Sequence, residues 1–359
     1  MTLAAAACSG GGEHAVRVDT PRAGSARSLP GPKSILQLGD SVASGEGTLY
    51  GYTYDRASQE WTGGNLDATW PPPYPDCHDS PDAYGQKVAK LFGADFHQLA
   101  CTGATFENGI SAPEVKSGTT YRPAEFGNWA TMQDLNAEYD RAKPDLVLVT
   151  LGADDVQFVP IVEACIENSY EFYFHLVSQK ECVVGNPGST VQRDFFDFLP
   201  TLKKGYTTLV SWIEARAKKN APNDAPPKIV FTTYADPLPA KGAKCPDVSY
   251  LYPEQVQYLE SLVGRMNQVI RSTILSLKKK NVGVADIQRA YQPAGIDHRW
   301  CTDDPWAYGL SIIKLSDPAT LESQAPFHPT PEGQASIAEH VTPTILRLFN
   351  TSLREVRRG

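Results

Sequence analysis

The sequence predicts an α/β fold in three layers, with a parallel sheet between two layers of helices. From residue 31 onward, short apolar runs alternate with longer stretches of helical periodicity. Two of the runs, DLVLVTL and IVFTTY, consist almost entirely of apolar or β-branched residues, which is typical of strands covered on both faces. Such alternation favours one sheet, so we expect a single domain over residues 31–359 rather than two.

Five strands are expected in chain order. They lie at residues 34–38, 96–100, 145–151, 229–234 and 282–287. Two segments, residues 42–80 and 288–327, do not follow the strand–helix rhythm. Both are rich in Pro, Gly and aromatic residues, which indicates long, ordered loops of the kind that often carry function.

Two helices have clear signals. The first begins at Pro253-Glu254, ends at the lysines of residues 278–280, and places its apolar residues three or four positions apart. Those residues are Val256, Leu259, Val263, Met266, Ile270, Ile274 and Leu277. The last helix is expected to begin with Thr330 as N-cap and Pro331 as its first residue. Its buried face would consist of Ile337, Val341, Ile345 and Leu348.

Composition excludes several classes of protein. The 359 residues carry a net charge of −8, which argues against bulk nucleic-acid binding. No apolar run approaches the roughly 18 residues that a membrane-spanning helix needs. Hydrophobic residues make up 41% of the chain, enough to bury a substantial core.

The first thirty residues contain no aromatic side chain and are rich in Ala, Gly, Ser and Arg, so we expect a disordered tether over 1–30. Leu3 to Ala7, followed by Cys8, resembles the end of a bacterial lipoprotein signal. A secretory or lipoprotein remnant with Cys8 lipidated is the favoured interpretation. A truncated start and a chance Ala-rich tail are the alternatives.

The tripeptide Gly39-Asp40-Ser41 follows the first strand directly, where ligands of parallel sheets bind. A plain turn would explain the tripeptide equally well. A serine nucleophile needs a base, and of the seven histidines His328 is distinguished by its place just before the last helix. A structural histidine at a helix start is the alternative.

Four blocks of sequence occur in a fixed order, each after a predicted strand or before the last helix. They are Gly39-Asp40-Ser41, Cys101-Thr102-Gly103-Ala104, Leu151-Gly152-Ala153-Asp154-Asp155, and Phe327-His328-Pro329 with Gly333-Gln334. Together they resemble the SGNH hydrolases, also called the GDSL esterase/lipase family, in their secreted bacterial, disulfide-containing type. The resemblance implies a flavodoxin-like α/β/α sandwich around a five-stranded parallel sheet. It also implies metal-independent ester hydrolysis with no cofactor.

The resemblance also assigns roles to residues. Ser41 would be the nucleophile and His328 the general base, and the backbone N–H groups of Ser41 and Gly103 would bind the oxyanion. The third block normally ends in Asn-Asp, but this chain has Asp154. An ionised Asp154 would repel the oxyanion, so it must be protonated, turned away or replaced by another donor. Asp40 and Asp155 are expected to support the site, Asp155 by crowding Asp154 with negative charge.

The family's orienting acid lies three residues before the histidine, and that position is Ala325 here. By resemblance to secreted members, the backbone carbonyl of Ala325 is the expected substitute, giving a Ser–His dyad. Asp317 or Glu322 could fold in, although nothing in the sequence favours them.

The six cysteines after Cys8 show no zinc-type spacing, so no metal site is expected, and spacing alone leaves their pairing open. By resemblance to secreted relatives, neighbours in sequence would pair. The expected disulfides are Cys77–Cys101, Cys165–Cys182 and Cys245–Cys301.

The predicted function is that of a secreted or cell-surface serine esterase, monomeric, acting on a lipid, a small ester or an acylated carbohydrate. The aromatic residues of 42–80 could line a cleft for an acyl chain or a sugar, or simply pack the loop onto the body. The alternative function is a cell-surface binding module that kept the fold and lost catalysis, for which Asp154 and Ala325 are the arguments.

Overall fold

The computed structural model describes residues 28–71, 77–106, 132–158, 160–162, 164–166, 195–248, 251–313 and 323–351. Most of the expected tether, including Cys8, lies outside these ranges, as do Cys182, Asp317 and Glu322. Within the described part of the chain, no helix is long and apolar enough to cross a membrane.

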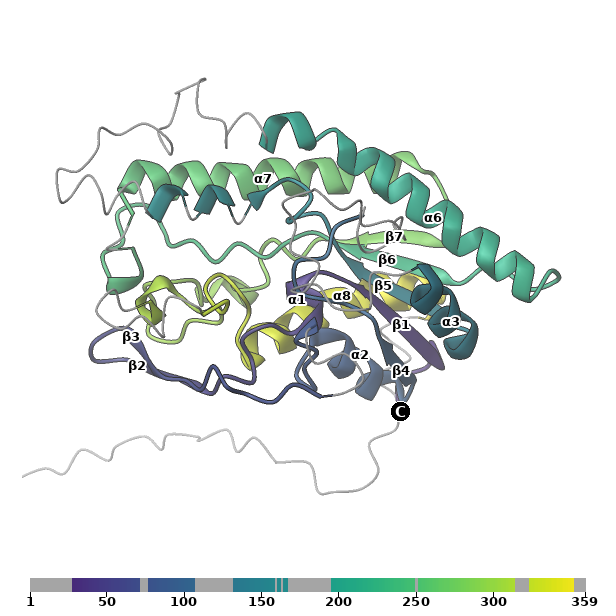
Figure 1. The fold of residues 1–359 in the computed structure, drawn as a ribbon, viewed down its shortest axis with the longest axis horizontal. Helices are drawn as coiled ribbons and strands as arrows, with labels where there is room; N and C mark the ends of the chain where they lie inside the picture. The colour runs from purple at the N-terminus through teal and green to yellow at the C-terminus, as the bar shows by residue number, and fades with distance from the viewer. Residues whose placement is uncertain are drawn as a thin grey trace, which may run out of the picture.

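Five parallel strands form the central sheet, as predicted (Figure 1). They are β1 (Ser34–Gly39), β4 (Asp95–Gln98), β5 (Leu146–Thr150), β6 (Lys228–Thr232) and β7 (Val282–Ala285), and their spatial order is β4-β1-β5-β6-β7. Leu38 of β1 lies opposite Val149 of β5. Every residue of β5 is buried, which explains its unbroken apolar run.

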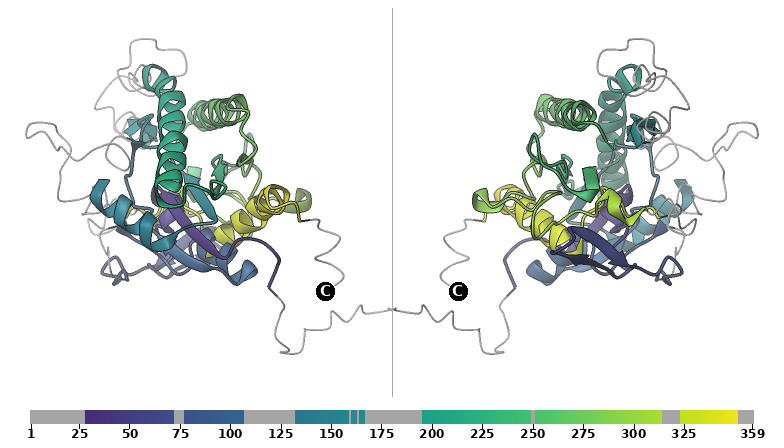
Figure 2. Two further views of the ribbon diagram at one scale, coloured as in Figure 1. Left: turned by 90° about the vertical axis from the view of Figure 1, so that its right-hand side faces the viewer. Right: turned by 90° about the vertical axis from the view of Figure 1, so that its left-hand side faces the viewer.

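Helices cover both faces of the sheet, which confirms the three-layer prediction (Figure 2). The helices α2 (Tyr84–Phe92) and α8 (Pro331–Leu348) pack together on one face. On the other face, α7 (Pro253–Ser276) packs against α6 (Thr201–Asn220), which contacts α3 (Met132–Ala142) through Trp212 and Tyr139. Short helical segments are α1 (Ser41–Ser44), η4 (Pro246–Val248), η5 (Pro293–Gly295) and η6 (Leu310–Ile312).

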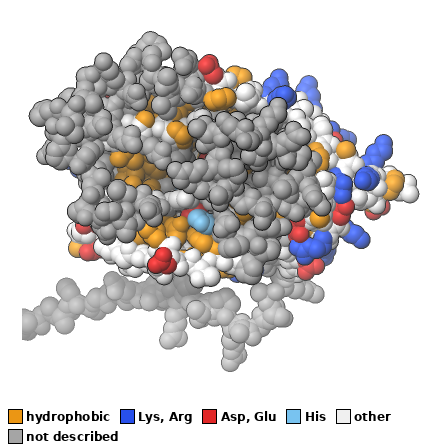
Figure 3. Space-filling model, in the orientation of Figure 1, with side chains coloured by type: hydrophobic (Ala, Val, Ile, Leu, Met, Phe, Trp, Pro, Cys, Tyr) orange, Lys and Arg blue, Asp and Glu red, His pale blue; other side chains and the backbone are white. Residues whose placement is uncertain are grey.

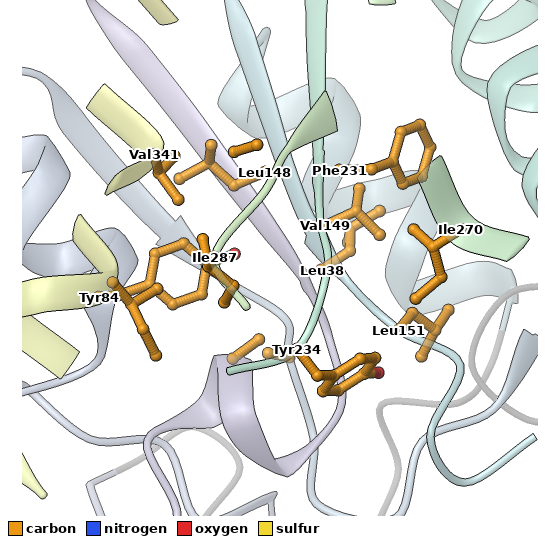
Figure 4. Close-up of a cluster of buried hydrophobic side chains, with 14 of the residues drawn as sticks. Leu38, Tyr84, Leu148, Val149, Leu151, Phe231, Tyr234, Ile270, Ile287 and Val341 are labelled. Atoms are coloured by element: carbon orange, nitrogen blue, oxygen red, sulfur yellow. The ribbon is translucent and has the colours of Figure 1, made fainter. Parts of the chain in front are cut away.

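Side chains from both helix layers meet the sheet in one core (Figure 4). Ile270 of α7 and Val341 of α8 are fully buried in this core, together with strand residues such as Leu148 and Phe231. The predicted apolar faces of the two helices are therefore the core faces. The first helix ends at Ser276, slightly earlier than expected, because Leu277 already serves as its C-cap.

The long segment 42–80 contains a hairpin that the sequence did not predict. Its strands are β2 (Tyr52–Asp55) and β3 (Glu60–Gly63), which pair antiparallel. A second hydrophobic cluster holds this segment on the body of the protein. Its buried members are Tyr50, Trp61, Trp70, Tyr308, Ile312 and Ala325. Tyr50, Trp61 and Trp70, the members from this segment, therefore pack onto the body rather than line an open cleft.

The last helix begins where predicted, with Thr330 as N-cap. The Thr330 hydroxyl accepts a hydrogen bond from the Gly333 N–H at 3.2 Å, and Pro331 occupies the first turn. Thr330 is nearly fully buried, so water cannot replace this bond readily.

Replacing Thr330 with Ala is expected to lower the free energy of unfolding by about 1 kcal/mol, because one N–H of the first turn loses its acceptor. Urea unfolding followed by circular dichroism measures the change. Thr330→Ser is the matched control, since it keeps the hydroxyl and should lose clearly less. Equal losses in the two variants would contradict the capping role.

Candidate active site

Ser41 lies at the carboxyl edge of the sheet, directly beyond the end of β1. Gly39 has φ +149°, and a Cβ there would lie only 2.2 Å from the Thr150 carbonyl oxygen, so no other residue fits this turn. Asp40 caps α1 by accepting a hydrogen bond from the Val42 N–H at 3.1 Å. The glycine and the capping aspartate together place Ser41 at the first position of α1 (Figure 1).

The structure brings His328 to Ser41 across 287 positions of sequence. The Nε2 atom of His328 lies 2.6 Å from the Oγ atom of Ser41. Its other ring nitrogen, Nδ1, lies 3.1 Å from the carbonyl oxygen of Pro326. A ring that donates from Nδ1 to a carbonyl leaves Nε2 as the acceptor for the serine proton.

The carbonyl that faces Nδ1 differs from the predicted one. The Ala325 carbonyl accepts a hydrogen bond from the backbone N–H of His328, at 3.0 Å, while Pro326 takes the ring. The carbonyl nearest to the ring is thus that of Pro326, one residue after the expected Ala325, and the carbonyls of Gln324 and Ala325 also favour the protonated ring. A backbone carbonyl still occupies the place of the missing carboxylate.

The residue before His328 is held in an uncommon backbone conformation. Phe327 has φ +70°, which is rare for a bulky residue and marks local strain. Its N–H donates to the Tyr308 carbonyl at 2.8 Å, and the Tyr308 N–H donates back to the His328 carbonyl at 2.9 Å. The ring of Phe327 also packs against Trp300, with centroids 4.5 Å apart. These contacts fix the direction of the imidazole, and the sequence carried no signal for them.

Burial lowers the pKa of His328 below its ordinary value. The charge of Glu46 and the nearby backbone carbonyls oppose this effect only in part. The ring is therefore neutral at neutral pH, which is the form that can accept a proton from Ser41.

Two backbone N–H groups near Ser41 have the properties of oxyanion donors. Within the described ranges, neither the Ser41 N–H nor the Gly103 N–H has a hydrogen-bond acceptor. The second block runs alongside the first, because the Cys101 N–H donates to the Gly39 carbonyl at 2.9 Å. Gly103 has φ +74°, which a glycine adopts without strain.

Three carboxyl groups gather behind these donors. The Asp155 carboxylate accepts from the Phe106 N–H at 3.0 Å, which ties it to the backbone just after the second block. Asp40 accepts a short hydrogen bond from the Tyr234 hydroxyl, whose oxygen accepts from the Ala153 N–H at 3.0 Å. Asp154 is half-buried, and its carboxyl has no hydrogen-bond partner among the described residues.

Burial and mutual crowding favour the protonated forms of Asp154 and Asp40. Burial, together with the charges of Asp40 and Asp155, raises the pKa of Asp154 well above its ordinary value. Burial also raises the pKa of Asp40 to about 7, although the Tyr234 hydrogen bond opposes the shift. Tyr234 was not singled out from the sequence, although it ends the apolar run that contains β6.

Two of the expected disulfides are present, Cys77–Cys101 and Cys245–Cys301. The first ties the segment after Ser41 to the second block. Cys165 is also disulfide-bonded, and its expected partner Cys182 lies outside the described residues.

On the face seen in Figure 1, hydrophobic side chains border a histidine side chain (Figure 3).

Comparison with known proteins adds to this geometry. A profile of the GDSL-like Lipase/Acylhydrolase family matches residues 38–335. No curated protein matches the chain. Among solved structures, phospholipase A1 from Streptomyces albidoflavus NA297 is 18% identical, with a TM-score of 0.46 over 87% of this chain and 97% of that one.

Two further structures show the same level of similarity. An extracellular lipase from Streptomyces rimosus is 17% identical, with a TM-score of 0.44 over 87% of this chain and 97% of its own. The aryl esterase of M. smegmatis is 14% identical, with a TM-score of 0.40 over 88% and 99%. Because the family profile spans most of the chain and includes all four blocks, the protein belongs to the GDSL-like lipase/acylhydrolase family.

Proposed function

We propose that the protein is a serine esterase that hydrolyses carboxylic esters through an acyl-enzyme on Ser41. The observation that carries the proposal is the 2.6 Å contact between Ser41 Oγ and His328 Nε2. His328 takes the hydroxyl proton as Ser41 attacks the ester carbonyl, then delivers it to the departing alcohol. Water, activated by the same ring, hydrolyses the acyl-enzyme.

The oxyanion of each tetrahedral intermediate is bound by the N–H groups of Ser41 and Gly103, with a protonated Asp154 as third donor. Each such donor typically contributes about 100- to 1,000-fold in rate. The raised pKa of Asp154 supports this role, since only the neutral acid has a proton to donate. Pro326 keeps the imidazole in the tautomer that accepts at Nε2.

The substrate proposed is a small ester or a sugar ester in preference to an anionic lipid. The net charge is −8, so anionic head groups would be repelled from the protein surface. The disulfides suit an oxidising compartment, which supports a secreted or surface-attached enzyme. The proposed enzyme acts as a monomer. Lipidation at Cys8 remains the proposed means of attachment.

The binding-module alternative has less support. The arguments for it were that Asp154 replaces the asparagine donor and that Ala325 replaces the orienting acid. The raised pKa of Asp154 lets it keep a proton to donate, and the Pro326 carbonyl contacts the His328 ring in place of the acid. A hydrogen-bonded serine and neutral histidine also serve no purpose in a module that only binds.

Ser41→Ala is expected to reduce kcat/KM at least about 10,000-fold on nitrophenyl esters, because the attacking oxygen is absent. A series of rising acyl-chain length also separates a preference for short esters from lipase behaviour. Mass spectrometry of the wild type treated with a fluorophosphonate should find the adduct on Ser41.

The control for Ser41→Ala is Ser272→Ala, which removes an exposed hydroxyl from α7 and should leave the rate unchanged. Hydrolysis that persists in Ser41→Ala would contradict the esterase proposal. So would the absence of hydrolysis in the wild type across the series.

A further inference from the structure

A buried carboxylate lies next to the proposed dyad. The side chain of Glu46 is fully enclosed, and its backbone N–H donates to the Ser41 carbonyl at 3.0 Å. At the following residue, a Cβ on Gly47 would lie 3.2 Å from the Cβ of Ala325. Residues 46 and 47 thus contact both the nucleophile's helix and the loop that carries His328.

Two side chains hold the Glu46 carboxylate in place. Its Oε1 atom accepts from the Tyr50 hydroxyl at 3.0 Å, and its Oε2 atom lies 2.6 Å from Nδ1 of His78. His78 is itself stacked on Trp70, with ring centroids 4.6 Å apart and planes 9° from parallel. A fully enclosed carboxylate is costly unless partners satisfy it, so this environment is built to keep a negative charge.

The titratable groups that interact with Glu46 are Tyr50 and His78 on its two oxygens, and His328 through space. The two histidines and the hydrogen bonds lower the pKa of Glu46 despite its burial. In return, the Glu46 charge is the largest influence that raises the pKa of His328. The Nδ1 atom of His328 is already occupied by the Pro326 carbonyl, so this charge acts without direct contact.

We propose that Glu46 is a positioning residue for the general base, whose carboxylate stabilises the imidazolium of His328 through space. The Glu46 charge would stabilise the imidazolium as the carboxylate missing at Ala325 would have done, while the Pro326 carbonyl orients the ring. The inference rests on the proposed Ser41–His328 mechanism, in which His328 becomes positively charged at every tetrahedral intermediate.

Glu46→Gln tests the inference, because it keeps the shape and removes the charge. Without the carboxylate the imidazolium is less stable, so the His328 pKa should drop by about one unit and kcat should fall by up to about tenfold. The acid limb of the kcat/KM profile then moves to lower pH. A merely structural defect would reduce the rate without moving this limb to lower pH.

NMR titration of the His328 ring, assigned with His328→Gln, gives the pKa without any substrate. An unchanged His328 pKa in Glu46→Gln would overturn the inference and leave the dyad intact. Persistent hydrolysis in Ser41→Ala would instead overturn the esterase proposal, and the NMR result would still stand on its own.

Two more variants make the test complete. Glu214→Gln removes a carboxylate of α6 that pairs with the exposed Lys279, and it should change neither rate nor His328 pKa. Glu46→Asp keeps the charge, but its shorter side chain moves the carboxylate away from the place that Tyr50 and His78 fix, so the acid limb and the His328 pKa of this variant should lie between those of the wild type and Glu46→Gln. If Glu46→Gln does not fold, no change in the His328 pKa of Glu46→Asp would overturn the inference.

Discussion

His328→Gln is expected to lower kcat/KM at least about 10,000-fold, and the double variant with Ser41→Ala should lose no more than either single variant. The Nε2 atom of His328 lies 2.6 Å from Ser41 Oγ, so the two side chains would act as one unit. When the residues of such a unit are removed together, their effects do not add. Initial rates on nitrophenyl acetate for the four proteins measure the cycle.

Gln is the replacement of choice at position 328 because it is planar and polar but cannot accept a proton at neutral pH. The control is His340→Gln on α8, whose ring faces the Ser336 carbonyl and takes no part in the site. His340→Gln should retain full activity. Additive losses in the double variant, or activity near that of the wild type in His328→Gln, would contradict the dyad.

The strands of the sheet were predictable because the burial of each strand leaves a pattern in its own residues. A strand such as β5, buried on both faces, must be apolar along its whole length, and that pattern is visible in the sequence. Thr330 and Pro331 likewise predict the start of α8, because helix capping depends on a few neighbouring residues. The β2–β3 hairpin was missed because its aromatic residues bury against distant segments, including Tyr308.

The site was predictable only in part. The sequence indicated Ser41 and His328 through their blocks, and the structure brings them into contact. Which carbonyl faces His328 depends on the backbone at Phe327, whose positive φ no residue preference would suggest. Tyr234 reaches the site only through the fold. Glu46 follows Ser41 by five positions, but its enclosure by Tyr50 and His78 could not be read from that spacing.

Asp154→Asn is expected to abolish a fall in activity that the wild type shows as pH rises. Below its raised pKa, Asp154 carries the proton that it would donate to the oxyanion. Above that pKa it becomes a carboxylate that repels the oxyanion, and each further pH unit lowers the protonated fraction about tenfold. The Asn amide donates at every pH, so at high pH the variant should exceed the wild type by up to about 100-fold.

Asp40→Asn distinguishes this mechanism from a general effect of removing an acid. The Asp40 charge is the largest electrostatic influence that raises the pKa of Asp154, so its removal should move the alkaline fall to lower pH without abolishing it. The amide keeps an oxygen for the Val42 N–H, so the cap of α1 is preserved. The measurement is the profile of kcat against pH for the wild type, Asp154→Asn and Asp40→Asn. If kcat of Asp154→Asn still falls at high pH as it does in the wild type, Asp154 is not the titrating donor.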